Sequence, residues 1–186
     1  MGVYGLTQYV KQNMPNLGIR TNVLSLKTIV VDGNSFCFYI AKKINWLKGS
    51  QYHEFITLIK RHLEVFTNSQ TELIFVFDGP LPDYKIEERH SRNQDKIEKL
   101  VLVIADAISN RNPDYHVQNL ATSLLPPFAI PIAIHTMKEL NFKCIVAEEE
   151  ADLFIARLAN SLNASVLSQD SDFFMFNIPS FILLDT

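Results

Sequence analysis

The chain has only two cysteines, Cys37 and Cys144, which are too few for a disulfide framework or a four-ligand zinc site. It also lacks a phosphate-binding glycine loop, since neither GxGxxG nor GxxxxGK occurs. No apolar run is long enough to span a membrane, and the N-terminus has neither the basic start nor the apolar stretch of a secretory signal. We therefore expect a soluble intracellular protein with reduced thiols and no membrane partner.

The sequence is also poor in net charge, which is -3 at pH 7. This value gives no overall signature of a nucleic-acid-binding protein, but a site rich in carboxylates would mask local basic patches in the sum. Apolar residues make up 47% of the 186 positions, which is enough for one domain with a two-sided core.

Five short apolar runs rich in β-branched or aromatic residues predict buried strands over residues 27–32, 72–78, 144–148, 164–170 and 180–185. Apolar residues at helical spacing predict helices over residues 35–47, 52–69, 85–110, 128–141 and 151–163. This alternation indicates an α/β fold with a mainly parallel sheet. Because the last predicted strand runs almost to the C-terminus, we expect the chain to be a fragment or a shortened form.

Acidic residues stand at the ends of four of the predicted strands. Three strands finish on an aspartate, and the acidic run EEEAD follows a fourth. Because ligands of open parallel sheets bind beyond the carboxyl ends of the strands, we expect these side chains to converge on one crevice. The predicted cluster contains Asp32, Asp78, Glu150, Asp152, Asp170 and Asp172.

Carboxylates crowded in this way repel one another, so the cluster is tolerable only if a positive charge lies within it. Ligands that are all oxygen favour Mg²⁺ or Mn²⁺ over zinc. Two such ions about 4 Å apart would activate a water molecule and stabilise the leaving oxygen of a phosphodiester. The pattern therefore predicts a two-metal hydrolytic site.

Some of these acids also have a simpler interpretation. Asp32 precedes Gly-Asn-Ser, and taken alone it is better explained as a helix N-cap. Glu148 and Glu149 would complement the dipole of the helix that follows them. The simpler interpretation becomes weaker as acids accumulate at one edge of the sheet.

Two pairs of acids are separated by a single residue, which requires a break in regular structure. Glu150 and Asp152 would lie on different sides of a regular helix, so they must straddle the junction between strand and helix. Asp170 and Asp172 suit a turn directly after their strand, with both side chains over the sheet edge. Residues 173–174, both phenylalanine, are expected to pack under the site.

A known protein family shares the order and approximate spacing of five stretches, MGVYGL, VVDGNSF, FVFDGPLPDYK, VAEEEAD and VLSQDSDFF. Through them the chain resembles the flap-endonuclease and xeroderma-group-G superfamily of structure-specific nucleases, most closely its Asteroid branch. The resemblance implies a PIN-like three-layer fold, with helices on both sides of the parallel sheet. It also implies a single nuclease core over residues 1–186 that lacks the family's seventh carboxylate and C-terminal helix-turn-helix part.

The resemblance implies a role for individual residues. All six carboxylates match the family's metal ligands, and Lys85 and Arg92 match its phosphate-steering lysine and arginine. The spacing of seven residues would place both cations on one helix face. Without the resemblance, a solvated helix face in contact with Glu87 and Glu88 would be the preferred interpretation. Gly2 matches the family's small second residue, which lies near the substrate.

The predicted function is that of a two-metal endonuclease, using Mg²⁺ or Mn²⁺, that cuts DNA where single strands join a duplex. By resemblance it would act in DNA repair in the nucleus. Residues 100–131 are apolar and interrupted by proline, so the arch that clamps single strands in flap endonucleases is expected to be short or different. Two alternatives stay open: a catalytically silent module that binds nucleic acid or protein, and a PIN-like ribonuclease.

Overall fold

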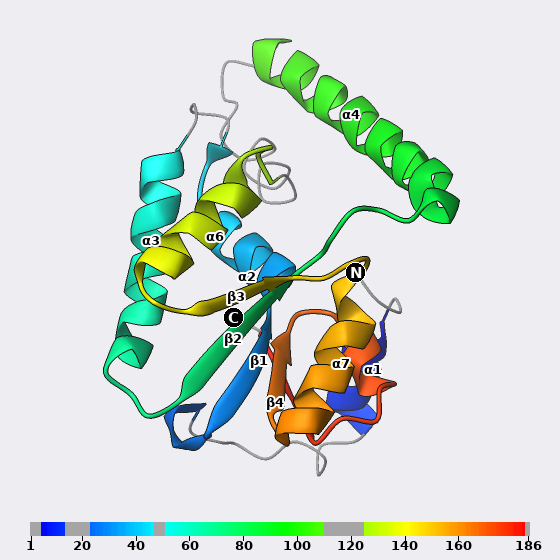
Figure 1. Cartoon of the computed structure of the whole chain (residues 1–186). Coiled ribbons are helices and arrows are strands. Elements are labelled where there is room, and N and C mark those ends of the chain that lie inside the picture. The colour runs from blue at the N-terminus through cyan, green and yellow to red at the C-terminus, as the bar shows by residue number, and fades with distance from the viewer. Residues whose placement is uncertain (1–4, 14–22, 47–50, 110–124, 185–186) are drawn as a thin grey trace.

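The computed structural model describes residues 5–13, 23–46, 51–109 and 125–184 (Figure 1). The helices are α1 (Leu6–Asn13), α2 (Gly33–Ala41), α3 (Tyr52–Thr67), α4 (Ile86–Ser109), α6 (Ala129–Glu139) and α7 (Ala151–Leu162). The strands are β1 (Thr28–Asp32), β2 (Glu72–Phe77), β3 (Lys143–Val146), β4 (Ser165–Ser168) and β5 (Ser180–Leu183). Short 3-10 helices are η2 (Val23–Ser25), η4 (Asp83–Lys85) and η5 (Ser171–Phe174).

The five strands form one sheet in the order β3-β2-β1-β4-β5, and every neighbouring pair is parallel. In the register of the central strands, Val31 lies opposite Phe75 on one side and Leu167 on the other. The predicted α/β class and parallel sheet are therefore confirmed. The observed strands β2 and β4 end before the acids that the prediction included in them, because those acids begin the next turn.

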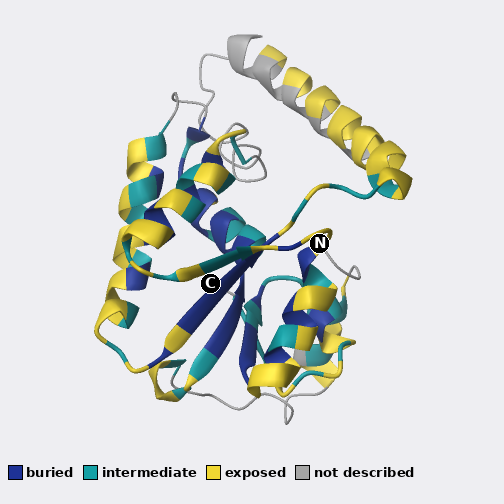
Figure 2. Ribbon diagram, viewed as in Figure 1, coloured by how far each residue is buried: buried dark blue, intermediate teal, exposed yellow. Residues whose placement is uncertain are grey.

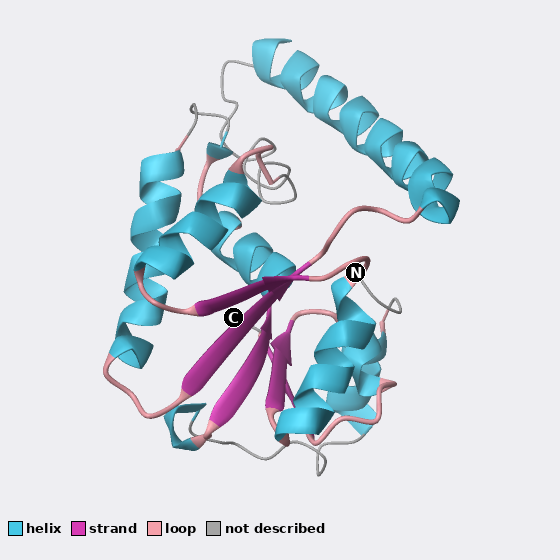
Figure 3. Ribbon diagram, in the orientation of Figure 1, coloured by secondary structure: helices cyan, strands magenta, loops and turns pink. Residues whose placement is uncertain are grey.

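Side chains of the central strands alternate between two apolar cores, one on each face of the sheet. Ile29 and Val31 of β1 belong to the core that α2, α3 and α6 cover, whereas Val30 belongs to the core that α7 covers. Figure 3 shows the resulting three layers, and Figure 2 shows that the central strands are the most deeply buried part. The predicted three-layer architecture is thus confirmed.

Helix α2 is shorter than the predicted helix over residues 35–47. It ends at Ala41, whose carbonyl oxygen accepts a hydrogen bond of 3.1 Å from the indole Nε1 of Trp46. Trp46 is 9% exposed and packs edge-on against Phe55 of α3. Folding this indole back onto the helix end is incompatible with further helical turns.

Helix α4 extends away from the sheet (Figure 1). Its described side chains are largely exposed, including Ile97 and Leu102, and its main described contact is with η4. The long helix predicted over residues 85–110 is confirmed. None of the described helices combines the length and the apolar character that a membrane span requires.

Candidate active site

The carboxyl ends of four neighbouring strands bring the predicted acids to one edge of the sheet. Asp32 is the last residue of β1, and Asp78 directly follows β2. Glu150 is the N-cap of α7, which follows β3, and Asp152 lies in the first turn of that helix. Asp170 is the N-cap of η5, directly after β4. The two pairs of acids thus sit at the junctions that their spacing predicted.

Asp32 is buried, and each of its two carboxylate oxygens accepts a hydrogen bond. Oδ1 accepts a 2.9 Å hydrogen bond from the backbone N–H of Ser35, which caps α2. Oδ2 accepts a 2.6 Å hydrogen bond from the hydroxyl of Ser168 at the end of β4. The capping role expected for Asp32 is confirmed. The second bond fixes the side chain in the gap between two adjacent strand ends.

Asp78 joins the end of β2 to the beginnings of α2 and α7. Its Oδ1 accepts from the backbone N–H of Ala151 at 2.9 Å, and its Oδ2 accepts from the amide of Asn34 at 2.5 Å. The next residue is packed so closely that a Cβ atom at Gly79 would lie 2.0 Å from the carbonyl oxygen of Ala147. Only glycine allows the chain to pass at this point.

The pKa of Asp78 is raised although the residue is partly open to solvent. Burial is the largest cause, and the hydrogen bond from the backbone N–H of Ala151 opposes it. The carboxylates of Asp32 and Glu150 raise the pKa further, while Arg89 lowers it. Asp78 therefore lies within electrostatic reach of residues from three other elements.

Asp152 has the most strongly perturbed carboxyl group in the cluster. Burial and the negative charges of four neighbouring carboxylates raise its pKa to about 7. In decreasing order of effect, these neighbours are Asp32, Asp170, Asp78 and Glu150. These four carboxylates, which the sequence predicted to converge with Asp152, are therefore close enough to hinder its ionisation, and the site favours a proton or a cation.

Glu150 is paired with Lys85 of η4. The Nζ atom of Lys85 lies 2.7 Å from Oε1 and 2.6 Å from Oε2 of the carboxylate. This hydrogen bonding raises the pKa of Lys85 above its ordinary value. The lysine expected to face a phosphate is thus positioned at the acidic cluster, where it neutralises one of the carboxylates.

Asp170 and Asp172 are arranged by the turn after β4. The backbone N–H of Asp170 donates to the hydroxyl of Ser168 at 2.9 Å, and Oδ1 of Asp170 accepts from the N–H of Asp172 at 3.0 Å. Asp172 and Asp152 line a hollow of about 180 Å³. Two predicted site residues cannot be placed: Gly2 and the side chain of Arg92 lie outside the described residues.

The donor set suits a hard divalent cation in charge and in chemistry, because it consists of carboxylate oxygens whose repulsion a cation would relieve. In the described part of the chain, no three His, Cys, Asp or Glu side chains are arranged as a ready ligand set. Protein donors hold several of the oxygens instead: Ser168 on Asp32, Asn34 on Asp78 and Lys85 on Glu150. A carboxylate oxygen has two lone pairs, so Asp32 and Asp78 could ligate a cation while keeping these donors, whereas Lys85 would have to release an oxygen of Glu150.

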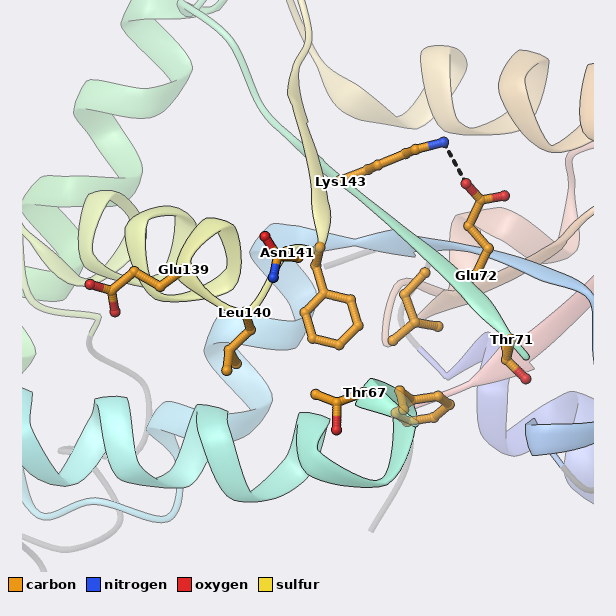
Figure 4. Close-up of a pocket in the computed structure, with 10 residues that line it drawn as sticks. Thr67, Thr71, Glu72, Glu139, Leu140, Asn141 and Lys143 are labelled. Atoms are coloured by element: carbon orange, nitrogen blue, oxygen red, sulfur yellow. Dashed lines mark hydrogen bonds and ion pairs between the residues drawn. The ribbon is translucent and has the colours of Figure 1, made fainter. Parts of the chain in front are cut away.

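A larger hollow, of about 480 Å³, lies at the opposite end of the sheet (Figure 4). Thr71 and Glu72 at the start of β2 line it together with Asn141 and Lys143 from the turn into β3. Lys143 forms an ion pair with Glu72 at 2.5 Å across its rim. Because the strands run away from this hollow towards the acids, it is no part of the carboxylate site.

Several residues that shape the site were missed by sequence reasoning. Ser168 and Asn34 hold two of the carboxylates, and Arg89 acts electrostatically on Asp78. Ser168 stands two residues before Asp170 and Asn34 two after Asp32, so proximity in the sequence was the available signal. Arg89 is four residues after Lys85, a spacing that would put both on one side of the long helix predicted to begin at residue 85.

Comparison with known proteins identifies the class to which this site belongs. The XPG N-terminal domain model matches residues 1–99, and a second XPG domain model matches residues 125–182. The chain therefore belongs to the XPG family, a PIN-like class of nucleases. The curated relatives of the chain include Asteroid proteins, the branch that the resemblance predicted.

Three relatives and one structure illustrate the likeness. The chain is 27% identical to the zebrafish single-strand DNA endonuclease ASTE1 over 98% of its length and 25% of the relative. It is 31% identical to fission yeast Asteroid homolog 1 (81% of this chain, 25% of the relative). It is 27% identical to a mouse constitutive coactivator of peroxisome proliferator-activated receptor gamma (95% and 24%). The chain thus spans about a quarter of the length of these relatives.

The catalytic core of Rad2 in complex with DNA substrate has a similar fold. It aligns with a TM-score of 0.57 and 20% identity over 94% of this chain and 49% of that one. At this identity the likeness concerns the fold alone. It supports the three-layer arrangement described above.

Proposed function

We propose that this chain is the catalytic core of a metal-dependent endonuclease that cuts DNA where a single strand joins a duplex. The carrying observation is the crowding around Asp152, whose pKa is raised to about 7 by burial and four neighbouring carboxylates. A fold gains nothing from such repulsion, whereas a cation site depends on concentrated negative charge. The name of the zebrafish relative, a single-strand DNA endonuclease, supports DNA as the substrate.

The ligands of the metal would be the six carboxylates of the cluster: Asp32, Asp78, Glu150, Asp152, Asp170 and Asp172. Two Mg²⁺ or Mn²⁺ ions would supply an activated water and stabilise the leaving oxygen of the phosphodiester. Ser168 and the N–H of Ser35 hold Asp32 in place, so this ligand is positioned before the substrate arrives. Asn34 and the N–H of Ala151 do the same for Asp78.

Lys85 has two roles in this proposal. It neutralises Glu150 in the protein described here, with Nζ within 2.7 Å of both carboxylate oxygens. With Glu150 among the residues that would hold the cation, the ammonium group of Lys85 would be available to bind a non-bridging oxygen of the scissile phosphate. Arg92, seven residues further along the chain, is proposed as its partner, and Gly2 as a residue beside the substrate.

A cleavage assay tests the proposal. End-labelled flap, overhang and single-stranded DNA, together with RNA of the same sequence, are incubated with wild type and Asp170→Asn in Mg²⁺, Mn²⁺ or chelator. We expect metal-dependent cutting of junction DNA that falls by at least about a hundredfold in the variant. Glu64→Gln, which removes an exposed carboxylate of α3 remote from the cluster, is the matched control and should cut normally.

One relative favours a second candidate function. The mouse protein is named a constitutive coactivator, so this fold also occurs in a protein whose name refers to no nuclease activity. If folded wild type leaves every DNA and RNA substrate intact, the chain is a binding module on a nuclease scaffold. Preferential cutting of RNA would make it a ribonuclease instead. A role in DNA repair in the nucleus belongs to the endonuclease proposal.

A further inference from the structure

The segment after the acidic turn exposes apolar side chains directly beside the carboxylates. Phe173 is 1% exposed and packs under the site, as expected. The expectation was wrong for Phe174, which is 38% exposed and packs edge-on against Phe181, with ring centroids 4.9 Å apart. Met175 is 65% exposed. Single exposed apolar residues are common on proteins, so the significance of these depends on what they line.

Met175 and Phe176 form the apolar wall of the hollow of about 180 Å³ whose other wall consists of Asp152 and Asp172. Phe176 packs against Phe173, with ring centroids 5.5 Å apart. Phe173 is in turn fixed in the core beneath α7. The hollow thus combines a firm apolar wall with two of the carboxylates in one small space.

A ligand that satisfies both walls needs a group that a cation can bridge to carboxylates and a flat apolar group next to it. A nucleotide has both, because its phosphate is joined through a sugar to a base with an apolar face. Thioether and aromatic side chains pack well on such faces, and they do so with every base. A free phosphate or a metal ion alone would leave the apolar wall without a partner.

We propose that this hollow is a subsite for a nucleobase beside the scissile phosphate, with Met175 as the residue that contacts the base. This inference rests on the proposed nuclease function and adds a point of substrate contact to it. Since the contact is made to the face of the base, it positions the strand without selecting its sequence.

A double-mutant cycle between protein and DNA tests the subsite. Junction substrates are prepared in which each nucleotide near the cleavage site in turn lacks its base. Their Kd for wild type and Met175→Ala is measured with Ca²⁺ in place of Mg²⁺, and KM and kcat are measured with Mg²⁺. On intact DNA we expect Met175→Ala to raise Kd and KM by about threefold to tenfold, with kcat nearly unchanged. The penalty should vanish on the one substrate that lacks the contacted base.

Two variants serve as controls. Met175→Leu keeps an apolar side chain and should retain most of the affinity. Leu162→Ala removes an exposed apolar side chain at the far end of α7 and should bind all substrates like wild type. The inference is overturned if Met175→Ala binds intact DNA as wild type does, or if it loses the same factor on every abasic substrate. In both cases the wild type still cuts DNA. Absence of cutting and binding by wild type would instead overturn the proposed function.

Discussion

The two ends of the parallel sheet differ in how charge is arranged. At the amino end, opposite charges are paired on the surface: Lys143 lies 2.5 Å from Glu72, and Lys60 lies 3.9 Å from Glu139. At the carboxyl end, burial and the charges of neighbouring carboxylates raise the pKa of Asp152 to about 7. The length of the strands separates the two ends, and the apolar side chains along these strands form the cores on both faces of the sheet.

This contrast separates charged residues that slightly stabilise the fold from charged residues that destabilise it. Paired surface charges contribute little to stability, but they cost little. Crowded carboxylates reduce stability, since burial and repulsion both disfavour their ionised forms. A cluster that costs stability is expected where the chemistry of the protein requires it. Removing a charge should therefore raise the stability of the protein at the carboxyl end of the sheet and lower it slightly at the amino end.

The largest effect is expected from Asp152→Asn. The pKa of Asp152 is raised from 3.8 to about 7 in the folded protein, so between these pH values the folded state holds a proton that the unfolded state has lost. The stability that the folded protein has with Asp152 neutral is therefore fully present below about pH 4 and is lost as the pH rises from about 4 to about 7. Without metal, we expect the variant to melt several degrees above wild type at pH 8 and at the same temperature at pH 4. Thermal melts in chelator across this range measure the difference.

Added metal should act against this difference in Tm, because it should stabilise wild type and not the variant. Mg²⁺ should raise the Tm of wild type at pH 8 but leave that of Asp152→Asn nearly unchanged, because a ligand is missing. Glu64→Gln, which removes an exposed carboxylate of α3 remote from the cluster, is the matched control and should leave the pH profile and the response to metal as in wild type. Equal pH profiles for wild type and Asp152→Asn would show that the acids do not repel each other in solution.

A smaller effect, on the affinity for metal, is expected when the positive side chain of Lys85 is removed from the acidic end. Lys85→Met frees Glu150 from an ion pair in which both oxygens are engaged, so it should bind Mn²⁺ about threefold more tightly than wild type in the absence of DNA. Cutting should nevertheless decrease, since the phosphate loses its ammonium partner. Calorimetric titration with Mn²⁺ measures the first quantity.

Arg89→Met separates this contact from a general change of charge. Arg89 also acts on the cluster, through Asp78, but the structure records no hydrogen bond from it to Glu150. If both variants strengthen Mn²⁺ binding equally, the Lys85–Glu150 pair has no special role and only net charge matters.

The sequence was sufficient to predict the layers and the cluster, because both follow from patterns that are local. Apolar runs alternating with helical spacing give the parallel sheet, and a parallel sheet places every strand's carboxyl end at one edge. Asp32, Asp78 and Asp170 could thus be grouped without knowledge of the strand order. In the observed order β3-β2-β1-β4-β5, the three strands that these residues follow are neighbours, which brings the acids together.

Contacts between side chains could not be predicted in this way. The partner of Glu150 is Lys85, which is 65 residues away, and the partner of Asp32 is Ser168, which is 136 residues away. Such choices depend on the register between elements. The early end of α2 escaped prediction for a similar reason, because it depends on Trp46 folding back onto Ala41. Helix α1 was not predicted, because eight residues give only about two turns in which to recognise a helical period.

The smallest effects should come from the ion pairs of the amino end, beginning with Lys143→Met. Lys143 and Glu72 are substantially exposed, with 67% and 43% of their side-chain surfaces open to solvent, so their ion pair is screened by water. We expect the free energy of unfolding to fall by less than about 1 kcal/mol in urea titrations, with cutting and Mn²⁺ binding unchanged. Lys60→Met, which removes the longer ion pair with Glu139, should have a still smaller effect. A loss of cutting in Lys143→Met would mean that the two ends of the sheet are coupled, because no described contact links Lys143 to the carboxylate cluster.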